Sequence, residues 1–105
     1  MALSPLTPEQ RIAALEKAAE ARRVRAAVKE ELRRGTSTLR TVLERSREDE
    51  ALGKLRVSAL LEALPGIGKV RAAQIMDEIG IAKTRRLRGL GMHQARALRE
   101  RFETQ

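Results

Sequence analysis

The segment from Leu64 to Ala72, Leu-Pro-Gly-Ile-Gly-Lys-Val-Arg-Ala, predicts a sharp turn between two helices. Proline cannot continue the preceding helix, and glycine adopts positive φ angles at little cost. We therefore expect positive φ at both Gly66 and Gly68, followed by a helix that ends near Ile79. The side chain of Ile67 should anchor the turn in the core.

The same pattern returns further along the chain. The leucine and the two glycines of Leu64–Gly68 recur in Leu87–Gly91, and an alanine and a large aliphatic residue follow each copy at the same distances. Two copies are too few for a repeat protein. The spacing instead predicts two Gly-x-Gly turns, each opening a helix, whose free backbone amides lie side by side.

Upstream of the turn, the sequence predicts one long helix. Thr7-Pro8-Glu9-Gln10 combines an N-cap threonine, proline at the first helical position and glutamine at the capping-box position. The next helix breaker is Gly35. The apolar stripe between them is thin and rich in alanine, which is typical of a projecting or lid-like helix that is partly solvated.

The rest of the chain predicts a compact unit of four short helices, the first of them capped by the Thr36-Ser37-Thr38 cluster. Their expected ranges are about 38–50, 57–64, 69–79 and 92–102. No stretch alternates with period two, so we expect no strands and assign the all-α class. The expected organisation is a long N-terminal helix, residues 1–35, and a compact helical domain, residues 36–105, which carries the candidate binding sites described below.

The composition excludes several kinds of function. With 105 residues, of which 42% are apolar, the chain can build one modest core. It contains no cysteine, so disulfides and cysteine-based metal or redox sites are impossible, and His93 has no second histidine with which to share a metal. The acidic residues show no paired pattern. We expect no enzyme activity, no cofactor and no metal.

The sequence also predicts where the protein resides. The segment Met1–Pro5 lacks the charged and apolar regions of a signal peptide, and no uncharged apolar run is long enough to span a membrane. The absence of thiols fits a reducing compartment. We expect a soluble cytoplasmic protein without a membrane partner and without a small-molecule substrate.

The charge of the chain predicts a polyanionic partner. The formal net charge is +8, with +2 on residues 1–52 and +6 on residues 53–105. Basic residues concentrated in one half are the expected footprint of a nucleic acid. Phe102 is the one aromatic residue, which argues against single strands, since these bind by stacking bases on aromatic side chains. A duplex bound through its backbone is favoured.

The turn is the first candidate site. A tight turn at Gly66 and Gly68 exposes backbone N–H groups at a helix N-terminus, where a phosphate binds, and Lys69 and Arg71 add positive charge. Known nucleotide-binding loops need other residues, such as Ser or Thr at Val70, and a preceding strand. The alternative interpretation is a turn that only reverses the chain between two packed helices.

The second candidate site is a basic segment without an acid, in which Lys83, Arg85, Arg86 and Arg88 precede Gly89 and Gly91. Arginines in such a segment can enter a minor groove and sense its width, with slight sequence preference. The alternative is a solvated charge run near a helix end. A third basic group is interleaved with glutamates and is interpreted as ordinary helix surface: Arg22, Arg23, Arg25 and Lys29.

These motifs resemble the actinobacterial integration host factor family. The resemblance rests on Leu64–Ala72, Gly80–Ala82 and Lys83–Gly91, and it covers essentially the whole chain. It implies a helical nucleoid-associated protein with a helix-two-turns-helix motif. Such a protein binds duplex DNA with little sequence preference, contacts phosphates and the minor groove, and changes DNA shape, nucleoid organisation and transcription.

The candidate DNA-binding residues combine the two sites with this resemblance. They are Gly66, Gly68, Lys69, Arg71, Lys83, Arg85, Arg86, Arg88, Gly89 and Gly91. We expect a monomer, with the first helix as a candidate for bridging two duplexes.

Two other functions stay open. The same turn resembles the head protein of the small ribosomal subunit, so ribosomal RNA binding is one alternative, although there the turn comes early and a long basic tail follows it. A helical adaptor for an acidic protein partner would also explain the charge and the lid-like first helix. Salt-sensitive binding to duplex of random sequence separates these functions.

Overall fold

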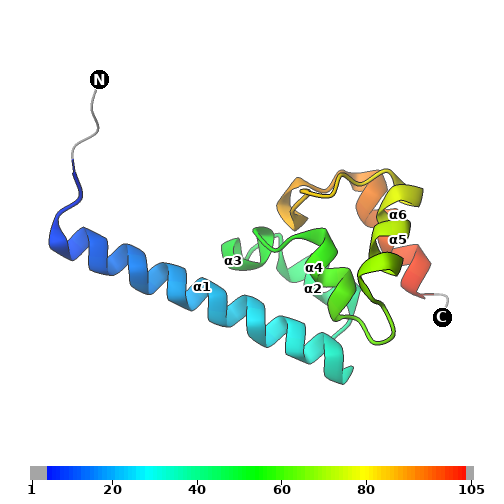
Figure 1. Ribbon diagram of the computed structural model, residues 1–105, viewed down its shortest axis with the longest axis horizontal. Helices are drawn as coiled ribbons and strands as arrows, with labels where there is room; N and C mark the ends of the chain where they lie inside the picture. Colours follow the sequence, from blue (N-terminus) through cyan, green and yellow to red (C-terminus); the bar gives the residue numbers. More distant parts are fainter. Residues whose placement is uncertain (1–4, 104–105) are drawn as a thin grey trace.

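The computed structural model describes residues 5–103 of the chain (Figure 1). Residues 1–4, which begin the segment that lacks a signal-peptide pattern, and residues 104–105 lie outside the described residues. The elements are α1 (Pro8–Arg34), α2 (Leu39–Arg45), α3 (Glu50–Gly53), α4 (Val57–Ala63), α5 (Lys69–Ile79), the 3₁₀ helix η1 (Leu87–Gly89) and α6 (Met92–Glu103). The expected all-α class is confirmed.

Both ends of α1 are fixed by the residues that the sequence indicated. The Thr7 hydroxyl accepts a hydrogen bond from the backbone N–H of Gln10 at 3.1 Å, and the Gln10 side chain accepts one from the N–H of Thr7 at 2.9 Å. This is a capping box, and it satisfies two donors that a helix start otherwise leaves free. The helix ends at Gly35, whose φ of 76° lies in the left-handed region.

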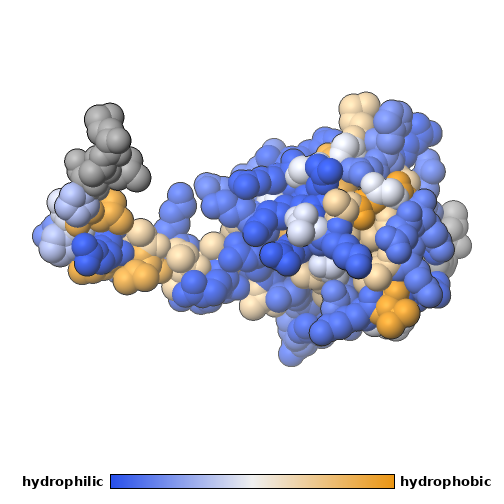
Figure 2. Space-filling view, turned by 45° about the horizontal axis from the view of Figure 1, so that its top comes forward, coloured by the Kyte–Doolittle hydropathy of each residue, from blue (hydrophilic) through white to orange (hydrophobic). Residues whose placement is uncertain are grey.

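The second half of α1 supplies its buried contacts with the rest of the molecule, and in the first half Lys17 pairs with Glu50 of α3 at 3.8 Å. Val28 and Leu32 are buried in the core, and Val24 packs against it. Residues 5–18 are all exposed, and α1 extends well away from the compact part (Figure 1). Figure 2 shows apolar side chains along this projecting end, where Ile12 and Leu15 are exposed, next to a mostly hydrophilic surface over the compact part.

The expected helix from about 38 to 50 is wrong at its end. Thr38 is its N-cap, but α2 stops at Arg45 and α3 begins separately at Glu50. The hydroxyl of Ser46 donates to the carbonyl of Leu43 at 2.7 Å, and the carboxylate of Asp49 accepts from the N–H groups that open α3. Such local side-chain bonds compete with the continuing helix. Residues 38–103 therefore form five α-helices and one 3₁₀ helix, not four helices.

One core joins all the elements, and it contains no charged side chain among residues 5–103. Its largest fully buried members come from α1, α3, α4, α5 and α6: Leu32, Leu52, Leu60, Leu61, Ile75 and Leu98. Because burying an unpaired charge is costly, the many lysines and arginines stay at the surface. The helices thus hold a basic surface over an apolar interior.

Candidate nucleic-acid interface

The two Gly-x-Gly copies fold in the same way. In the first copy the N–H of Ile67 donates to the carbonyl of Leu64 at 3.1 Å, and α5 opens with a bond from Ala72 to Gly68 at 2.9 Å. The second copy repeats both bonds at the equivalent residues and at the same two distances. The expectation that each copy forms a turn that opens a helix is confirmed.

The two copies differ in the backbone φ angles of their glycines. Gly66 has a φ of 78°, as expected, but Gly68 has a φ of −93° and a ψ of −176°, which is extended backbone open to any residue. The expectation of positive φ at Gly68 is wrong, because the chain has already reversed at Gly66 and only has to enter α5. Gly89 lies within η1 and has no positive φ.

The two turns do not lie side by side. The side chain of Gln94, in the first turn of α6, donates to the carbonyl of Gly80 at the end of α5, at 2.9 Å. Ile67, in the first Gly-x-Gly turn, lines the same hollow as Phe102 at the end of α6. The turns thus lie near opposite ends of α6, which at 12 residues is about 18 Å long. Sequence spacing alone carries no information on how two helices are oriented.

The turn at Gly66 presents free donors and positive charge to solvent. No side chain caps α5, and its first helical hydrogen bond comes from Ala72, so the N–H groups of residues 69–71 precede the ladder. Lys69 and Arg71 are exposed, and neither forms an ion pair within residues 5–103. Free amides at a positive helix end together with two cations suit a phosphate group.

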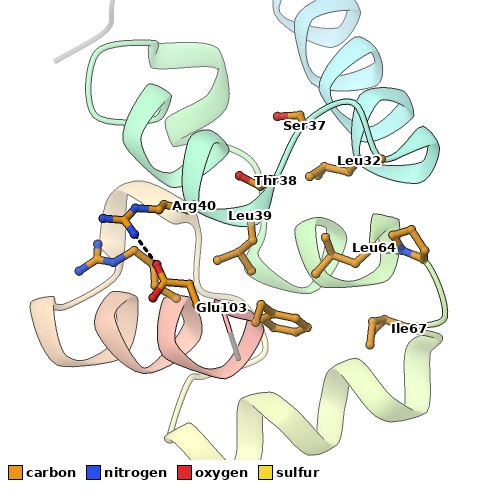
Figure 3. A pocket seen from close by; sticks show the side chains of 12 residues that line it. Leu32, Ser37, Thr38, Leu39, Arg40, Leu64, Ile67 and Glu103 are labelled. Atoms are coloured by element: carbon orange, nitrogen blue, oxygen red, sulfur yellow. Dashed lines mark hydrogen bonds and ion pairs between the residues drawn. The ribbon is translucent and has the colours of Figure 1, made fainter. Parts of the chain in front are cut away.

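The inner side of the same turn is apolar. Ile67 packs against the core, as expected, and faces a hollow of about 550 Å³ (Figure 3). In Figure 3 the side chains of Leu32, Leu39 and Leu64 point into the same space, and Arg40 and Glu103 pair at its edge. The turn is thus fixed from within by apolar contacts while its backbone faces outward.

The basic segment is tied to the chain that precedes α4. The N–H of Val57 donates to the carbonyl of Arg85 at 3.0 Å, and the N–H of Leu87 donates to the carbonyl of Leu55 at 2.9 Å. These bonds form an isolated antiparallel bridge between Arg56 and Arg86. Within residues 5–103 no strand is formed, as expected. In Figure 1 the segment after α5 accordingly runs across to η1 beside α3.

This bridge adds cations that the sequence analysis missed. Arg56 is exposed and directly opposite Arg86, and the Arg86 guanidinium donates to the carbonyl of Lys54 at 2.8 Å. Residues 54–56 lie some 30 positions upstream of the basic segment, so local spacing gave no signal of their proximity.

Two glycines let the arginines lie close to the backbone. The Arg85 guanidinium donates to the carbonyl of Gly89 at 3.0 Å, and a side chain at Gly89 would place its Cβ 3.2 Å from the Cδ of Arg85. Gly53 in α3 is buried, and a Cβ there would lie 3.3 Å from the Cβ of Arg88. The absence of a side chain at Gly53 therefore allows η1 to approach α3.

All four cations of the basic segment are exposed, and none has a carboxylate partner in the described part of the chain. On α1, by contrast, Arg23 pairs with Glu20 at 2.7 Å and Arg34 pairs with Glu30 at 2.9 Å. Cationic side chains without a carboxylate partner attract anions over the surface and hydrogen-bond them on contact.

Residues 5–103 hold no group of three or more His, Cys, Asp or Glu side chains that could bind a metal ion. In the same range, each helix is too short or too polar to cross a membrane.

Comparison with known proteins identifies a domain family and several relatives of this chain. The model of the S13-like H2TH domain family matches residues 32–102. The chain is 62% identical to integration host factor of Mycobacterium tuberculosis over 102 residues, 97% of each protein, and 57% identical to that of Streptomyces coelicolor over 102 residues, 97% of this chain and 95% of the relative. The chain belongs to the actinobacterial integration host factor family.

The family assignment extends to a solved structure. A solved structure, described as "Structure of sIHF bound to an 8bp palindromic DNA", superposes on this integration host factor family member with a TM-score of 0.81 and 52% sequence identity. The match covers 83% of this chain and 98% of the solved chain. The integration host factor of Mycolicibacterium smegmatis is 61% identical over 103 residues, 98% of each protein. The resemblance seen in the sequence is confirmed.

Proposed function

We propose that this integration host factor family member binds double-stranded DNA with little sequence preference and acts in the nucleoid as an architectural protein, not an enzyme. The observation that carries this proposal is the solved relative bound to DNA, at 52% identity and a TM-score of 0.81. The unpaired cations of the turn and of the basic segment support it. Neither site contains the clustered acidic or histidine side chains that hydrolytic or metal chemistry requires.

Two kinds of contact are proposed. The amides at Gly66 and Gly68, with Lys69 and Arg71, bind backbone phosphates. The basic segment enters the minor groove, and its proposed contact residues are Lys83, Arg85, Arg86, Arg88, Gly89 and Gly91. Phosphate contacts carry no sequence information, and minor-groove arginines sense groove width and deformability. A protein bound in this way favours one DNA shape over others, which is the proposed route to nucleoid organisation and transcription.

The binding unit is proposed to be residues 36–105 acting as a monomer, with residues 1–35 as an extension. On α1, Arg22 and Lys29 have no ion pair in the described chain, so this helix is the candidate for a second duplex. Capture of a labelled duplex on a second, immobilised duplex tests bridging directly. Capture that persists when Arg22 and Lys29 are both replaced by alanine would assign bridging elsewhere.

The first experiment is a salt titration of binding to a duplex of random sequence. Four to six neutralised phosphates give a log–log slope of about −3.6 to −5.4 and a loss of affinity of about 10²- to 10³-fold between 50 and 200 mM salt. The triple variant Arg85→Ala, Arg86→Ala, Arg88→Ala should flatten this slope. The matched control removes three cations of α1 that are paired with glutamates: Arg23→Ala, Arg33→Ala, Arg34→Ala.

Each outcome points to one function. Steep salt dependence, preference for duplex over single strands and loss in the first variant only would support the proposal. Preference for structured RNA as competitor would support the ribosomal alternative. A flat salt response would support an acidic protein partner.

A further inference from the structure

A second cleft of about 560 Å³ lies beside the basic segment, between α2 with the turn that follows it, η1 and α6, and it shares Arg40 and Arg99 with the hollow of Figure 3. Four arginines from three distant parts of the chain line it, together with one carboxylate, Glu44: Arg40, Arg47, Arg88 and Arg99. Only Arg88 belongs to the basic segment. A hollow lined predominantly by one sign of charge focuses the field on whatever enters it.

Most of this positive charge is not neutralised by the protein. Arg40 pairs with Glu44 at 3.4 Å and with Glu103 at 2.5 Å. Arg47, Arg88 and Arg99 form no ion pair and no side-chain hydrogen bond with any residue of the 5–103 range, whereas Arg96, on the same helix as Arg99, finds a glutamate at 2.9 Å. Three guanidinium groups that face one hollow repel one another until an anion with several charges joins them.

The other lining of the cleft is apolar. Leu90, Met92 and Ala95 contribute to it, and Met92 is 81% exposed, the highest value among the exposed large hydrophobic side chains of the described chain. A flexible methionine at the edge of a pocket makes favourable contacts with an aromatic ring. The cleft thus offers strong anion binding on one side and a surface for a flat ring on the other.

We propose that this arginine cleft binds a nucleoside polyphosphate. The phosphates would be held by Arg47, Arg88 and Arg99, and the base would lie against Met92. The volume of the cleft falls within the range of small-ligand sites. In this cleft, arginine guanidinium groups would bind the phosphates, since the sequence contains no glycine-rich loop of the nucleotide-binding kind. A convex duplex reaches the rim of such a hollow but does not fill it.

One consequence rests on the proposed function. Arg88 lines the cleft and also belongs to the proposed DNA surface. A bound nucleotide therefore occupies a cation that the duplex needs, so ligand and duplex compete. The nucleotide would lower the affinity for DNA without contacting the turn at Gly66.

The test uses isothermal calorimetry on the full chain at low salt, with ATP and with inorganic triphosphate as a probe that lacks the ring. Arg47→Gln with Arg99→Gln should weaken both probes about tenfold or more, since bonds between charged groups are the strong ones. Arg22→Gln with Lys29→Gln removes the same charge from α1 and should change affinity by less than about twofold. Met92→Ala should weaken ATP and leave triphosphate unchanged.

A measurement on the wild-type protein keeps the test independent of variant folding. Titration with ATP, followed by amide chemical shifts, should move residues 46–47 and 91–95 first. Shifts centred on residues 66–71, or equal losses in the cleft and α1 variants, would overturn the proposal. Duplex binding is measured in parallel. If the wild type does not bind ATP and the cleft variant loses affinity for duplex, the cleft is an extension of the DNA surface and the nucleotide proposal is overturned. If the wild type binds ATP but not duplex, only the proposed function is overturned.

Discussion

At the scale of single residues, Gly66 is the position of the turn whose backbone requires glycine. Its φ is 78°, and a Cβ built there meets no atom within 4 Å. Gly68 is equally open but has a φ of −93°. A side chain at Gly66 therefore costs backbone strain alone, and one at Gly68 costs little.

We predict that Gly66→Ala lowers the free energy of unfolding by about 1–2 kcal/mol, the cost of a left-handed backbone with a Cβ. For a domain of this size each 1 kcal/mol corresponds to a fall in Tm of about 4–8 °C. Gly68→Ala is the matched control and should shift Tm much less. Thermal unfolding followed by circular dichroism measures both, and equal shifts in the two variants would contradict the geometry of the turn.

The arginines of the basic segment divide into structural and free ones. The Arg86 guanidinium donates to the carbonyl of Lys54, whereas the side chain of Arg88 forms no hydrogen bond within residues 5–103. Arg86→Ala should therefore lower the unfolding free energy by about 0.5–1.5 kcal/mol, the net contribution of one hydrogen bond. Arg88→Ala keeps the Cβ that packs near Gly53 and should change stability by less than about 0.5 kcal/mol.

Urea unfolding of the two variants separates these roles. Both substitutions should weaken duplex binding if the proposed function holds, so binding alone does not distinguish them. Equal stability of the two variants would mean that the bond from Arg86 to Lys54 contributes nothing in solution.

What the sequence predicted at this scale is local. The capping box at Thr7, the reversal at Gly66 and the end of α5 at Gly80 each depend on neighbouring residues. A few residue types at adjacent positions are therefore enough to predict their backbone geometry. The approach of Arg56 to Arg86 depends on how α3 and η1 pack, so no local pattern could reveal it. The candidate DNA contacts themselves stay predictions.

At the scale of elements, α1 combines a well-capped start with a first half that has no buried side chain. Residues 5–18 are exposed, so the projecting turns depend on the cap and on helix propensity, whereas Leu32 is fully buried. Isolated helical turns are marginal in water. The two halves of one helix are therefore expected to differ in local stability.

We predict that Thr7→Ala frays the projecting half and leaves global stability unchanged. Loss of an N-cap costs about 1 kcal/mol, but only the unpacked turns depend on this one. Amide hydrogen exchange should accelerate at residues 10–16, with no change in Tm. Leu32→Ala is the contrast: it should cost about 2–5 kcal/mol of unfolding free energy. A large fall in Tm for Thr7→Ala would show that the projecting half packs on the core in solution.

The division between α2 and α3 shows why helix ends are harder to predict than helix starts. Serine and aspartate, the residue types at positions 46 and 49, also occur inside helices, and the sequence from 38 to 50 contains no proline or glycine. The break arises because Asp49 caps a new helix that must turn to place Leu52 in the core. Tertiary packing decides this, and a local pattern cannot weigh it.

At the scale of the whole molecule, the projecting helix sets the shape. The principal extents are 51 × 33 × 25 Å, and the radius of gyration of the Cα atoms is 15.9 Å. A compact domain of the same length has a radius of about 13 Å. The difference reflects the unpacked half of α1.

Small-angle scattering of the free protein at low concentration should therefore give a radius of gyration clearly above about 13 Å, the compact value. Deletion of residues 1–16 should bring the value close to that of a compact chain. A full-length value already near the compact one would mean that α1 folds back, and concentration-dependent growth would contradict the monomer.

The main-chain bonds between 55–57 and 85–87 have one further consequence. Because peptide atoms fix where this segment runs, its course is independent of most of the side chains it carries. Side chains at positions 85 and 88 can therefore be exchanged for other chemical groups without a change in the path of the backbone. A photocrosslinking or fluorescent residue placed there would report what touches this surface in a living cell.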